Sequence, residues 1–276
     1  MLPRPPKKAM KLSDAIRRLA DAGVDSPAHD ARELFEHFGG YSRASLTGHD
    51  PESDEPALLD AVARRCERYP LQYLIGECGF YRELYRVTPD VLIPRADTEL
   101  LVDVAVRKCR GGERILDLCT GSGCIPISVL NNTKNTAALA VDISDGALAV
   151  ARENAARYAL EGRIDFLKMD LLCDFPDGKW DIITANPPYI PEEVYETLAP
   201  EIASEPRIAF VAEENGLLFY RRILEHGRAH LKEGGLFLFE IGYDQREGIT
   251  RLADRYGLSV EILRDLGGND RVAVIS

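Results

Sequence analysis

Residues 114–123 read RILDLCTGSG, a short apolar run that ends in a glycine-containing turn. From here to the C-terminus, similar runs such as AALAVDI, IDFLKMD, WDIITAN and GLFLFEIG alternate with helical segments such as SDGALAVARENAARYAL. This alternation indicates a parallel sheet with helices on both faces. The last two runs, LSVEILRDL and RVAVIS, are joined by a tight turn, GGND, so the final strand is expected to run antiparallel to its neighbour. We therefore predict an α/β fold with a doubly wound, seven-stranded sheet and a terminal antiparallel strand.

The first 70 residues differ from the rest because they carry helical patterns only. Ser13 is expected to cap a first helix, Ser26 followed by Pro27 to open a second, and Pro70 to end a third. The stretch CGFYRELYRVTPDVLIPR that follows is rich in aromatic and β-branched residues broken by turn formers, which is typical of a hairpin.

These patterns predict three parts. A small all-α domain spans residues 1–70, a hairpin-like connector spans 71–95, and the α/β domain spans 96–276. The α/β domain is expected to open with a helix that starts near Asp97 or Thr98.

The composition limits the class of protein. Of the 276 residues, 45% are hydrophobic and 29% are charged, as in a soluble chain of one large or two modest domains. No apolar stretch approaches the roughly 18 residues that a membrane span needs, and the basic start, LPRPPKK, predicts a disordered tail rather than a signal peptide or a nucleic-acid arm. The six cysteines form no C-x-x-C pair. We expect a cytoplasmic protein with reduced thiols and no membrane association.

The charge argues against stable nucleic-acid binding, because the net charge is -11 and the pI is near 5.1, whereas such binding needs a basic face.

His226 and His230 stand four residues apart, a spacing that metal ligands on a helix also use. However, the sequence has no H-E-x-x-H motif, and the charged residues Arg222, Glu225 and Arg228 surround the pair. We interpret the pair as part of a solvated helix face and predict no metal site.

The loop after the first strand is a candidate ligand site, because ligands of open parallel sheets lie beyond the carboxyl ends of the strands, where the strand order reverses. Its glycines let the backbone approach a ligand, and it leads into a helix N-terminus that favours negative charge. A glycine turn needed only for chain geometry is the alternative. The candidate contacts in this loop are Asp117, Cys119, Thr120, Gly121, Ser122 and Gly123.

Acidic residues end the next two strands. Asp142, followed by Ile143, stands where a carboxylate accepts both ribose hydroxyls of an adenosine, and Asp170 is placed to bond an adenine amino group, with Leu171 beside it to cover the ring. The alternatives are a helix cap for Asp142 and turn chemistry for Asp170. A nicotinamide dinucleotide would also use an acidic residue here, but Pro126 stands where G-x-G-x-x-G needs its third glycine, which disfavours that ligand.

The fourth strand ends in residues 182–191, IITANPPYIP. An NH2 group attached to a carbonyl or an aromatic ring is a poor nucleophile, because its lone pair is delocalised. The Asn186 side-chain oxygen and the Pro187 carbonyl can accept its two hydrogens and orient that lone pair. Pro187 and Pro188 stiffen the turn, and Tyr189 offers a flat face to a planar group. The tetrapeptide therefore predicts a clamp for a planar, NH2-bearing substrate, with Asn186, Pro187 and Tyr189 as catalytic residues.

Several motifs resemble those of the release-factor glutamine methyltransferases, the HemK/PrmC family. They are the Asn-Pro-Pro-Tyr box, CTGSG, LIPRADTE with the preceding GFYRELYRV, EPR at residues 205–207 and the closing GGNDRVAVI. The resemblance covers nearly the whole chain, and the predicted sheet is that of class I S-adenosylmethionine-dependent methyltransferases. The sequence departs from the family pattern at Cys119, where glycine is more usual, and at Ala96, where proline is.

The resemblance implies an enzyme that transfers a methyl group from S-adenosyl-L-methionine to the side-chain amide nitrogen (N5) of the glutamine in the Gly-Gly-Gln motif of peptide chain release factors. The other product is S-adenosyl-L-homocysteine, and the modification modulates translation termination. Residues 1–70 would dock the release factor, and we expect a monomer. Arg95 and Thr98 would lie near the site. The cofactor would contact the three loops named above and Asn186. The substrate glutamine would contact Asn186, Pro187, Pro188 and Tyr189.

Two other classes of protein stay open. Adenine-N6 methyltransferases of DNA or RNA present a flipped base to the same tetrapeptide, so the motif alone does not decide between them and a protein substrate. The acidic balance and the lack of a recognisable target-reading module disfavour nucleic acid. A non-enzymatic adaptor that only binds the cofactor is disfavoured by Asn186, because binding alone needs no amide at the methyl group.

Overall fold

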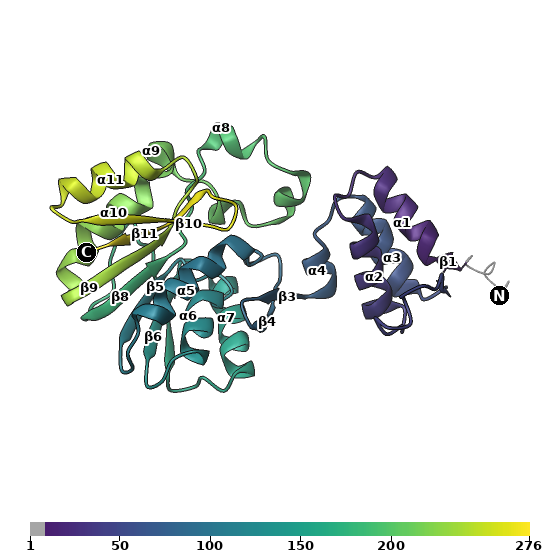
Figure 1. Ribbon diagram of the computed structural model, residues 1–276, viewed down its shortest axis with the longest axis horizontal. Coiled ribbons are helices and arrows are strands. Elements are labelled where there is room, and N and C mark those ends of the chain that lie inside the picture. The colour runs from purple at the N-terminus through teal and green to yellow at the C-terminus, as the bar shows by residue number, and fades with distance from the viewer. Residues whose placement is uncertain (1–8) are drawn as a thin grey trace. The chain divides into compact units, whose positions relative to one another are not determined.

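The computed structural model describes residues 9–276, which form two compact units (Figure 1). Unit 1 holds the chain up to Gly76 together with Ala199–Ser204, and unit 2 holds Glu77–Leu198 and Glu205–Ser276. The predicted basic tail lies outside the described residues. No helix within residues 9–276 is long and apolar enough to cross a membrane.

Unit 1 is a small helical bundle. Its core consists mostly of buried side chains of three helices, among them Leu19, Phe35 and Val62, and also includes Leu46 and Leu71. The elements of unit 1 are β1 (Met10–Lys11), α1 (Leu12–Asp21), α2 (Pro27–Phe38), β2 (Glu52–Ser53), α3 (Pro56–Cys66), α4 (Leu71–Ile75) and the 3-10 turn η2 (Pro200–Ser204). Pro27 opens α2 as predicted, since a proline at the first helical position loses no hydrogen bond.

Two details of unit 1 differ from the prediction. Ser13 does not cap α1, because Lys11 occupies the cap position and the Ser13 hydroxyl instead donates to Asp50 at 2.8 Å. The third helix, α3, ends at Cys66, four residues before Pro70, and the short helix α4 follows this proline with Leu71 buried in the core of unit 1. The compact unit therefore runs to Gly76, whose φ of +82° suits a helix end in the left-handed region.

The segment η2, distant in sequence, belongs to unit 1 through buried charges. The Arg65 guanidinium donates to Asp30 at 2.7 Å and to Glu201 at 3.0 Å, and Arg68 donates to Glu201 at 2.6 Å. Buried arginine needs such partners, because an unpaired charge in the interior is costly.

Unit 2 is built on a seven-stranded sheet of order β10-β11-β9-β8-β5-β6-β7. The five strands from β9 to β7 are parallel, and β11 pairs antiparallel with both β9 and β10, which confirms the predicted fold class. A hairpin precedes the sheet, formed by β3 (Glu77–Phe80) and β4 (Glu83–Arg86). The strands of the sheet are β5 (Arg114–Leu118), β6 (Ala137–Asp142), β7 (Ile164–Lys168), β8 (Trp180–Ala185), β9 (Leu231–Glu240), β10 (Val260–Arg264) and β11 (Asp270–Ile275).

Helices cover both faces of this sheet (Figure 1). The helical elements of unit 2 are η1 (Ala96–Thr98), α5 (Glu99–Lys108), α6 (Cys124–Asn131), α7 (Asp145–Arg157), α8 (Glu192–Tyr195), η3 (Arg207–Ala209), α9 (Glu213–Gly216), α10 (Leu218–Gly227), η4 (Arg228–His230) and α11 (Arg246–Arg255). Side chains of α5, α6 and α7 share one hydrophobic cluster, and side chains of α10 and α11 share the other.

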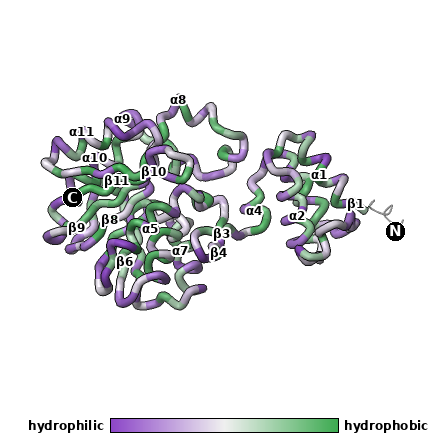
Figure 2. Tube along the Cα trace, viewed as in Figure 1, coloured by the Kyte–Doolittle hydropathy of each residue, from purple (hydrophilic) through white to green (hydrophobic). Residues whose placement is uncertain are grey.

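Alternation along each strand produces the two clusters. Ile115 belongs to the cluster of one face and Leu116 to that of the other, because successive side chains of a strand point to opposite sides. Figure 2 shows the central strands in green, the colour of hydrophobic residues, as expected for strands buried on both faces. The strand order reverses at β5, which lies between β8 and β6, so the carboxyl ends of these three strands meet at one crevice.

Candidate active site

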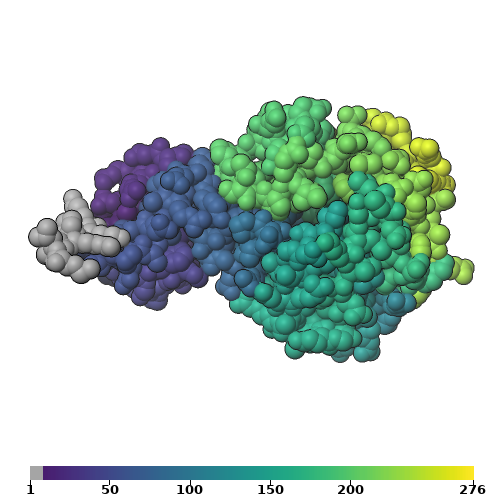
Figure 3. Space-filling model, turned by 180° about the vertical axis from the view of Figure 1, so that it is seen from behind, coloured from purple at the N-terminus to yellow at the C-terminus, as the bar shows by residue number. Residues whose placement is uncertain are grey.

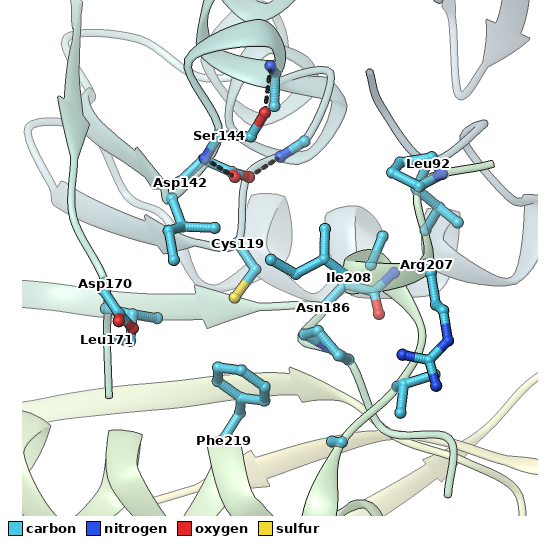
Figure 4. A pocket seen from close by; sticks show the side chains of 18 of the residues that line it. Leu92, Cys119, Asp142, Ser144, Asp170, Leu171, Asn186, Arg207, Ile208 and Phe219 are labelled. Carbon is cyan, nitrogen blue, oxygen red and sulfur yellow. Dashed lines mark hydrogen bonds between the residues drawn. The ribbon is translucent and has the colours of Figure 1, made fainter. Parts of the chain in front are cut away.

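A cavity of about 500 Å³ lies at the carboxyl ends of β5, β6 and β8, within unit 2. Its walls come from the β5, β6, β7 and β8 loops, from residues 90–92 and from residues 206–219 (Figure 4). Figure 3 shows teal residues around 150 and green residues around 210 on one face of this unit, and both regions contribute to the lining. Of the predicted site residues, the cavity is lined by Cys119, Gly121, Asp142, Ile143, Asp170, Leu171, Asn186 and Pro188.

The turn after β5 is held by the β6 carboxylate. Gly121 donates its backbone N–H to Asp142 Oδ2 at 2.9 Å, and the Ser144 N–H bonds Oδ1 at 3.0 Å (Figure 4). Gly123 has a φ of +78°, and a Cβ there would lie 3.0 Å from Ile127 and 3.2 Å from Ala151, so glycine lets the turn pack closely. Asp142 thus shapes the turn as well as facing the cavity. Burial raises its pKa above the ordinary value, although three backbone N–H groups act in the opposite direction.

Cys119 occupies a backbone position that favours glycine. Its φ is +58°, in the left-handed region, where a side chain costs roughly 1–2 kcal/mol. Its sulfur faces the cavity in Figure 4, and burial raises the pKa of the thiol well above its ordinary value. The departure from the glycine pattern therefore carries strain and places a neutral thiol in the wall of the cavity.

Three predicted residues of the same turn lie behind the cavity wall. Asp117 is fully buried, its Oδ1 accepts a bond from the Thr184 hydroxyl at 2.6 Å, and burial raises its pKa to about 7. Asp117 Oδ2 and the hydroxyls of Thr120 and Ser122 are buried without a hydrogen-bond partner in the described structure. These polar atoms are enclosed within the turn, and none of the three residues lines the cavity.

Asp170 lines the cavity and also performs turn chemistry. Its Oδ1 accepts the Leu172 N–H at 2.9 Å, and its Oδ2 accepts a bond from the Cys173 thiol at 3.3 Å. Leu171 beside it is buried and faces the cavity together with Met169. The third loop therefore supplies an apolar wall with one carboxylate at its edge.

The Asn-Pro-Pro-Tyr turn is fixed by backbone hydrogen bonds. The N–H groups of Tyr189 and Ile190 both donate to the Phe210 carbonyl, at 3.1 and 2.8 Å. Asn186 Nδ2 donates to the Thr98 hydroxyl at 3.4 Å, while Asn186 Oδ1 accepts no hydrogen bond from the described residues. The amide oxygen is therefore free to accept a bond from a ligand in the cavity.

Tyr189 does not line the cavity. Its ring is half-buried, and its hydroxyl donates to Oε1 of Glu240, the last residue of β9, at 3.4 Å. Burial raises the pKa of this hydroxyl above its ordinary value. Pro187 is buried outside the lining, so the structure brings Asn186 and Pro188 to the cavity and leaves Pro187 and Tyr189 behind them.

The segment 206–209 forms a wall for which the sequence motifs indicate no role in the site. Glu205, buried before it, accepts the Ile93 N–H at 2.9 Å and pairs with Arg95. Arg95 therefore anchors this wall and does not itself line the cavity. Phe219 completes the lining opposite Asn186 (Figure 4), and no sequence signal distinguishes it from a core residue of α10.

The histidine pair does not form a solvated face, contrary to the prediction. His226 stacks on Phe175 with ring centroids 6.3 Å apart, and His230 lies 5.2 Å from the same ring. Both rings are half-buried because they pack on this aromatic side chain. Within residues 9–276, no group of three or more His, Cys, Asp or Glu residues could hold a metal ion.

Buried carboxyl groups should make stability fall as pH rises. Burial raises the pKa of Asp117 and of Glu240 to about 7, so the folded state retains protons that the unfolded state loses. Their stabilising contribution is fully present below about pH 4 and is lost as pH rises to about 7, by on the order of 3 kcal/mol per group between about pH 5 and about pH 7. Urea unfolding between about pH 5 and about pH 8 should show Asp117→Asn gaining stability relative to wild type as pH rises. Asp177→Asn, at the surface, should follow wild type throughout.

The sheet order and the polar loops around the crevice define a methyltransferase fold. A solved methyltransferase from Pyrococcus furiosus shares this fold with a TM-score of 0.52, at 19% identity, over 69% of this chain and 86% of that chain. Two family models match: the PrmC N-terminal domain over residues 11–76 and the methyltransferase small domain over residues 96–209.

Curated relatives match over almost the full length. The release factor glutamine methyltransferase of Caulobacter vibrioides is 39% identical, with 93% of this chain and 92% of that protein covered. Its counterpart in Bordetella pertussis is 41% identical, with 92% and 96% covered. The chain belongs to the release factor glutamine methyltransferase family and is a methyltransferase.

Proposed function

We propose that this protein transfers a methyl group from S-adenosylmethionine to N5 of the glutamine in the Gly-Gly-Gln motif of a peptide chain release factor. The observation that carries the proposal is the free Oδ1 of Asn186, a residue that lines the cavity and whose Nδ2 is held by the Thr98 hydroxyl. The full-length similarity to proteins named release factor glutamine methyltransferases supports the substrate.

The residues of the cavity fit the cofactor. Adenosine needs a carboxylate for its ribose and an apolar wall for its base, and Asp142 and Leu171 line the cavity with these chemistries. The methionine part would lie next to the β5 turn, where Cys119 and Gly121 line the cavity. When bound, S-adenosylmethionine supplies a sulfonium methyl group that a nitrogen lone pair can attack.

The chain's own part in the reaction is to orient the amide. Asn186 Oδ1 and the Pro187 carbonyl would accept the two hydrogens of the glutamine NH2, turn its lone pair toward the methyl group and stabilise the positive charge that develops on nitrogen. No general base is required, because the methylated nitrogen is strongly acidic and its proton can leave to water. The stiff Pro187-Pro188 turn keeps the acceptors in place before substrate arrives.

Unit 1 would dock the release factor. None of the described cavity-lining residues belongs to this unit. Its match to the PrmC N-terminal domain extends over nearly all of its described residues up to Gly76.

Asp142→Asn should weaken cofactor binding. The asparagine keeps the shape but removes the charge and one of the two acceptors that bond Gly121 and Ser144, so both the ribose contact and the turn suffer. We expect the Kd for S-adenosylmethionine, measured by calorimetry, to rise about 10- to 100-fold, as when one charge-assisted hydrogen bond is lost. Asp145→Asn, an exposed carboxyl one turn away, is the matched control and should leave the Kd unchanged.

A transfer assay with labelled S-adenosylmethionine tests the proposed function. It offers the enzyme a purified release factor, the same factor with its Gly-Gly-Gln glutamine changed to asparagine, and adenine-containing DNA. Label on the unmodified factor alone supports the proposal. Label on DNA but not on the factor would establish an adenine-N6 methyltransferase instead.

A further inference from the structure

A line of side chains runs from Asn186 into the sheet behind the Asn-Pro-Pro-Tyr turn. Asn186 Nδ2 donates to the hydroxyl of Thr98, which ends η1 and is 2% exposed. The next polar group is the carboxylate of Glu240, which ends β9 and is also 2% exposed. None of these contacts is required by the strand pairing of the sheet, so the fold alone does not explain two buried polar side chains here.

The direction of the Asn186 amide depends on its neighbour. An amide presents two donors at one end and an acceptor at the other, and a threonine hydroxyl can both accept and donate. If Thr98 donated its proton to Asn186, the amide would turn and present its NH2 end to the cavity, where it could not accept a hydrogen from a substrate. The clamp works only if the Thr98 proton has another acceptor.

The Glu240 carboxylate has one oxygen left to act as that acceptor. Its Oε1 accepts the Tyr189 hydroxyl at 3.4 Å, whereas its Oε2 is buried and accepts no hydrogen bond from residues 9–276. Burial raises the pKa of this carboxyl to about 7, and the Thr98 hydroxyl and the nearby Arg271 guanidinium act in the opposite direction. One carboxylate can therefore take the Thr98 proton through Oε2 while it holds Tyr189 through Oε1.

We propose that Thr98 and Glu240 are positioning residues, which hold the amide of Asn186 with its oxygen toward the substrate and align Tyr189 behind it. This inference rests on the proposed function and names two residues that act through Asn186 without touching the substrate. The ion pair of Arg271 with Asp97 at 3.1 Å holds η1 in place next to Glu240.

The inference predicts a specific kinetic pattern. Thr98→Val, which keeps the shape but removes the hydroxyl, should lower kcat about 10- to 100-fold, because the amide is no longer oriented. The KM for release factor and the Kd for cofactor should change less than about threefold. Thr98→Ser, which restores the hydroxyl, should recover most of the wild-type kcat. Glu240→Gln should resemble Thr98→Val, because its NH2 group can donate to the Thr98 oxygen and drive the hydroxyl proton toward Asn186.

The experiment measures kcat, KM and cofactor Kd for the full-length variants with purified release factor, after thermal unfolding has shown that each is folded. Matched controls are Thr250→Val and Glu233→Gln, on α11 and on the start of β9, away from the cavity. The decisive comparison adds Thr98→Val to Asn186→Ala: a residue that acts only through Asn186 has no further effect there.

The possible outcomes separate the alternatives. A loss confined to kcat, recovered by Thr98→Ser and absent in the Asn186→Ala background, supports the inference. A wild-type kcat for Thr98→Val, or a loss that adds fully to that of Asn186→Ala, overturns it while the proposed function stands. A wild-type enzyme that leaves the release factor unlabelled overturns the proposed function and this inference with it. If Glu240→Gln does not fold, the Thr98 variants alone decide between these outcomes.

Discussion

Asn186→Ala should transfer methyl groups about 100 to 1,000 times more slowly than wild type, the range found when one preorganised charge-stabilising contact is removed. The alanine removes Oδ1, the acceptor left free at the cavity, while the Pro187 carbonyl remains. The effect should appear in kcat, because the acceptor matters most when charge develops on the nitrogen.

Asn131→Ala is the control for that result. Asn131 is exposed at the end of α6, and its side chain contacts Glu83 rather than the cavity. The control should keep wild-type kcat, and both variants should keep the wild-type melting temperature within the error of a thermal scan. An Asn186→Ala enzyme with undiminished turnover would rule out the clamp.

Gly216→Ala should be nearly inactive although residue 216 is not a cavity residue. Glu214, Asn215 and Gly216 all adopt left-handed backbone angles, and a Cβ on Gly216 would stand 2.0 Å from the Tyr189 carbonyl oxygen and 2.7 Å from Gln245 Nε2. Contacts this short force the Asn-Pro-Pro-Tyr turn to move. Since displacing a reacting group by about 1 Å can cost about 100-fold in rate, we expect at least that loss, together with a lower melting temperature.

Gly257→Ala separates the clash from the backbone cost. Gly257 has a φ of +69°, and a Cβ at this position would have no heavy atom within 4 Å, so the alanine variant carries only the conformational penalty of about 1 kcal/mol. It should lose stability but keep full activity, measured by the same transfer assay and a thermal scan. Equal activities for the two variants would show that Gly216 does not support the turn.

Local chemistry explains why much of the fold could be predicted. The strands β5, β6, β8 and β9 are short apolar runs bounded by turns, and buried parallel strands leave that pattern whatever their order. The GGND turn likewise forces β10 and β11 into an antiparallel pair. Ser144 caps α7 by accepting the Ala147 N–H at 3.2 Å. The two residues are only three positions apart, so this contact can be predicted from the sequence.

Long-range contacts explain what could not be predicted. The segment 199–204 joins unit 1 through Glu201, whose partners lie more than 130 positions earlier in the chain. Ser13 does not cap α1, because its hydroxyl donates a hydrogen bond to the distant Asp50. The histidine pair packs inward because Phe175 comes from another part of the sequence. Helical periodicity contains no information about any of these partners.

The candidate site shows the same division. Cys119, Asp142 and Asn186 are predictable because each ends or directly follows a strand at the crevice, a position that topology determines. The resemblance places Thr98 near the site, and the fold brings its hydroxyl to 3.4 Å from Asn186 Nδ2, whereas no sequence motif indicates a role for Glu240 at the end of β9. The direction in which Tyr189 points, toward Glu240 rather than into the cavity, is equally a property of the packing.

The most direct test of the proposed reaction is to locate the methyl group on the product. A release factor incubated with the enzyme and S-adenosylmethionine is digested, and its peptides are fragmented in a mass spectrometer. We expect one added methylene on the side chain of the Gly-Gly-Gln glutamine, and none when the Asn186→Ala enzyme is used. A methylene on another residue of the factor, or an unmodified factor, would contradict the proposed reaction.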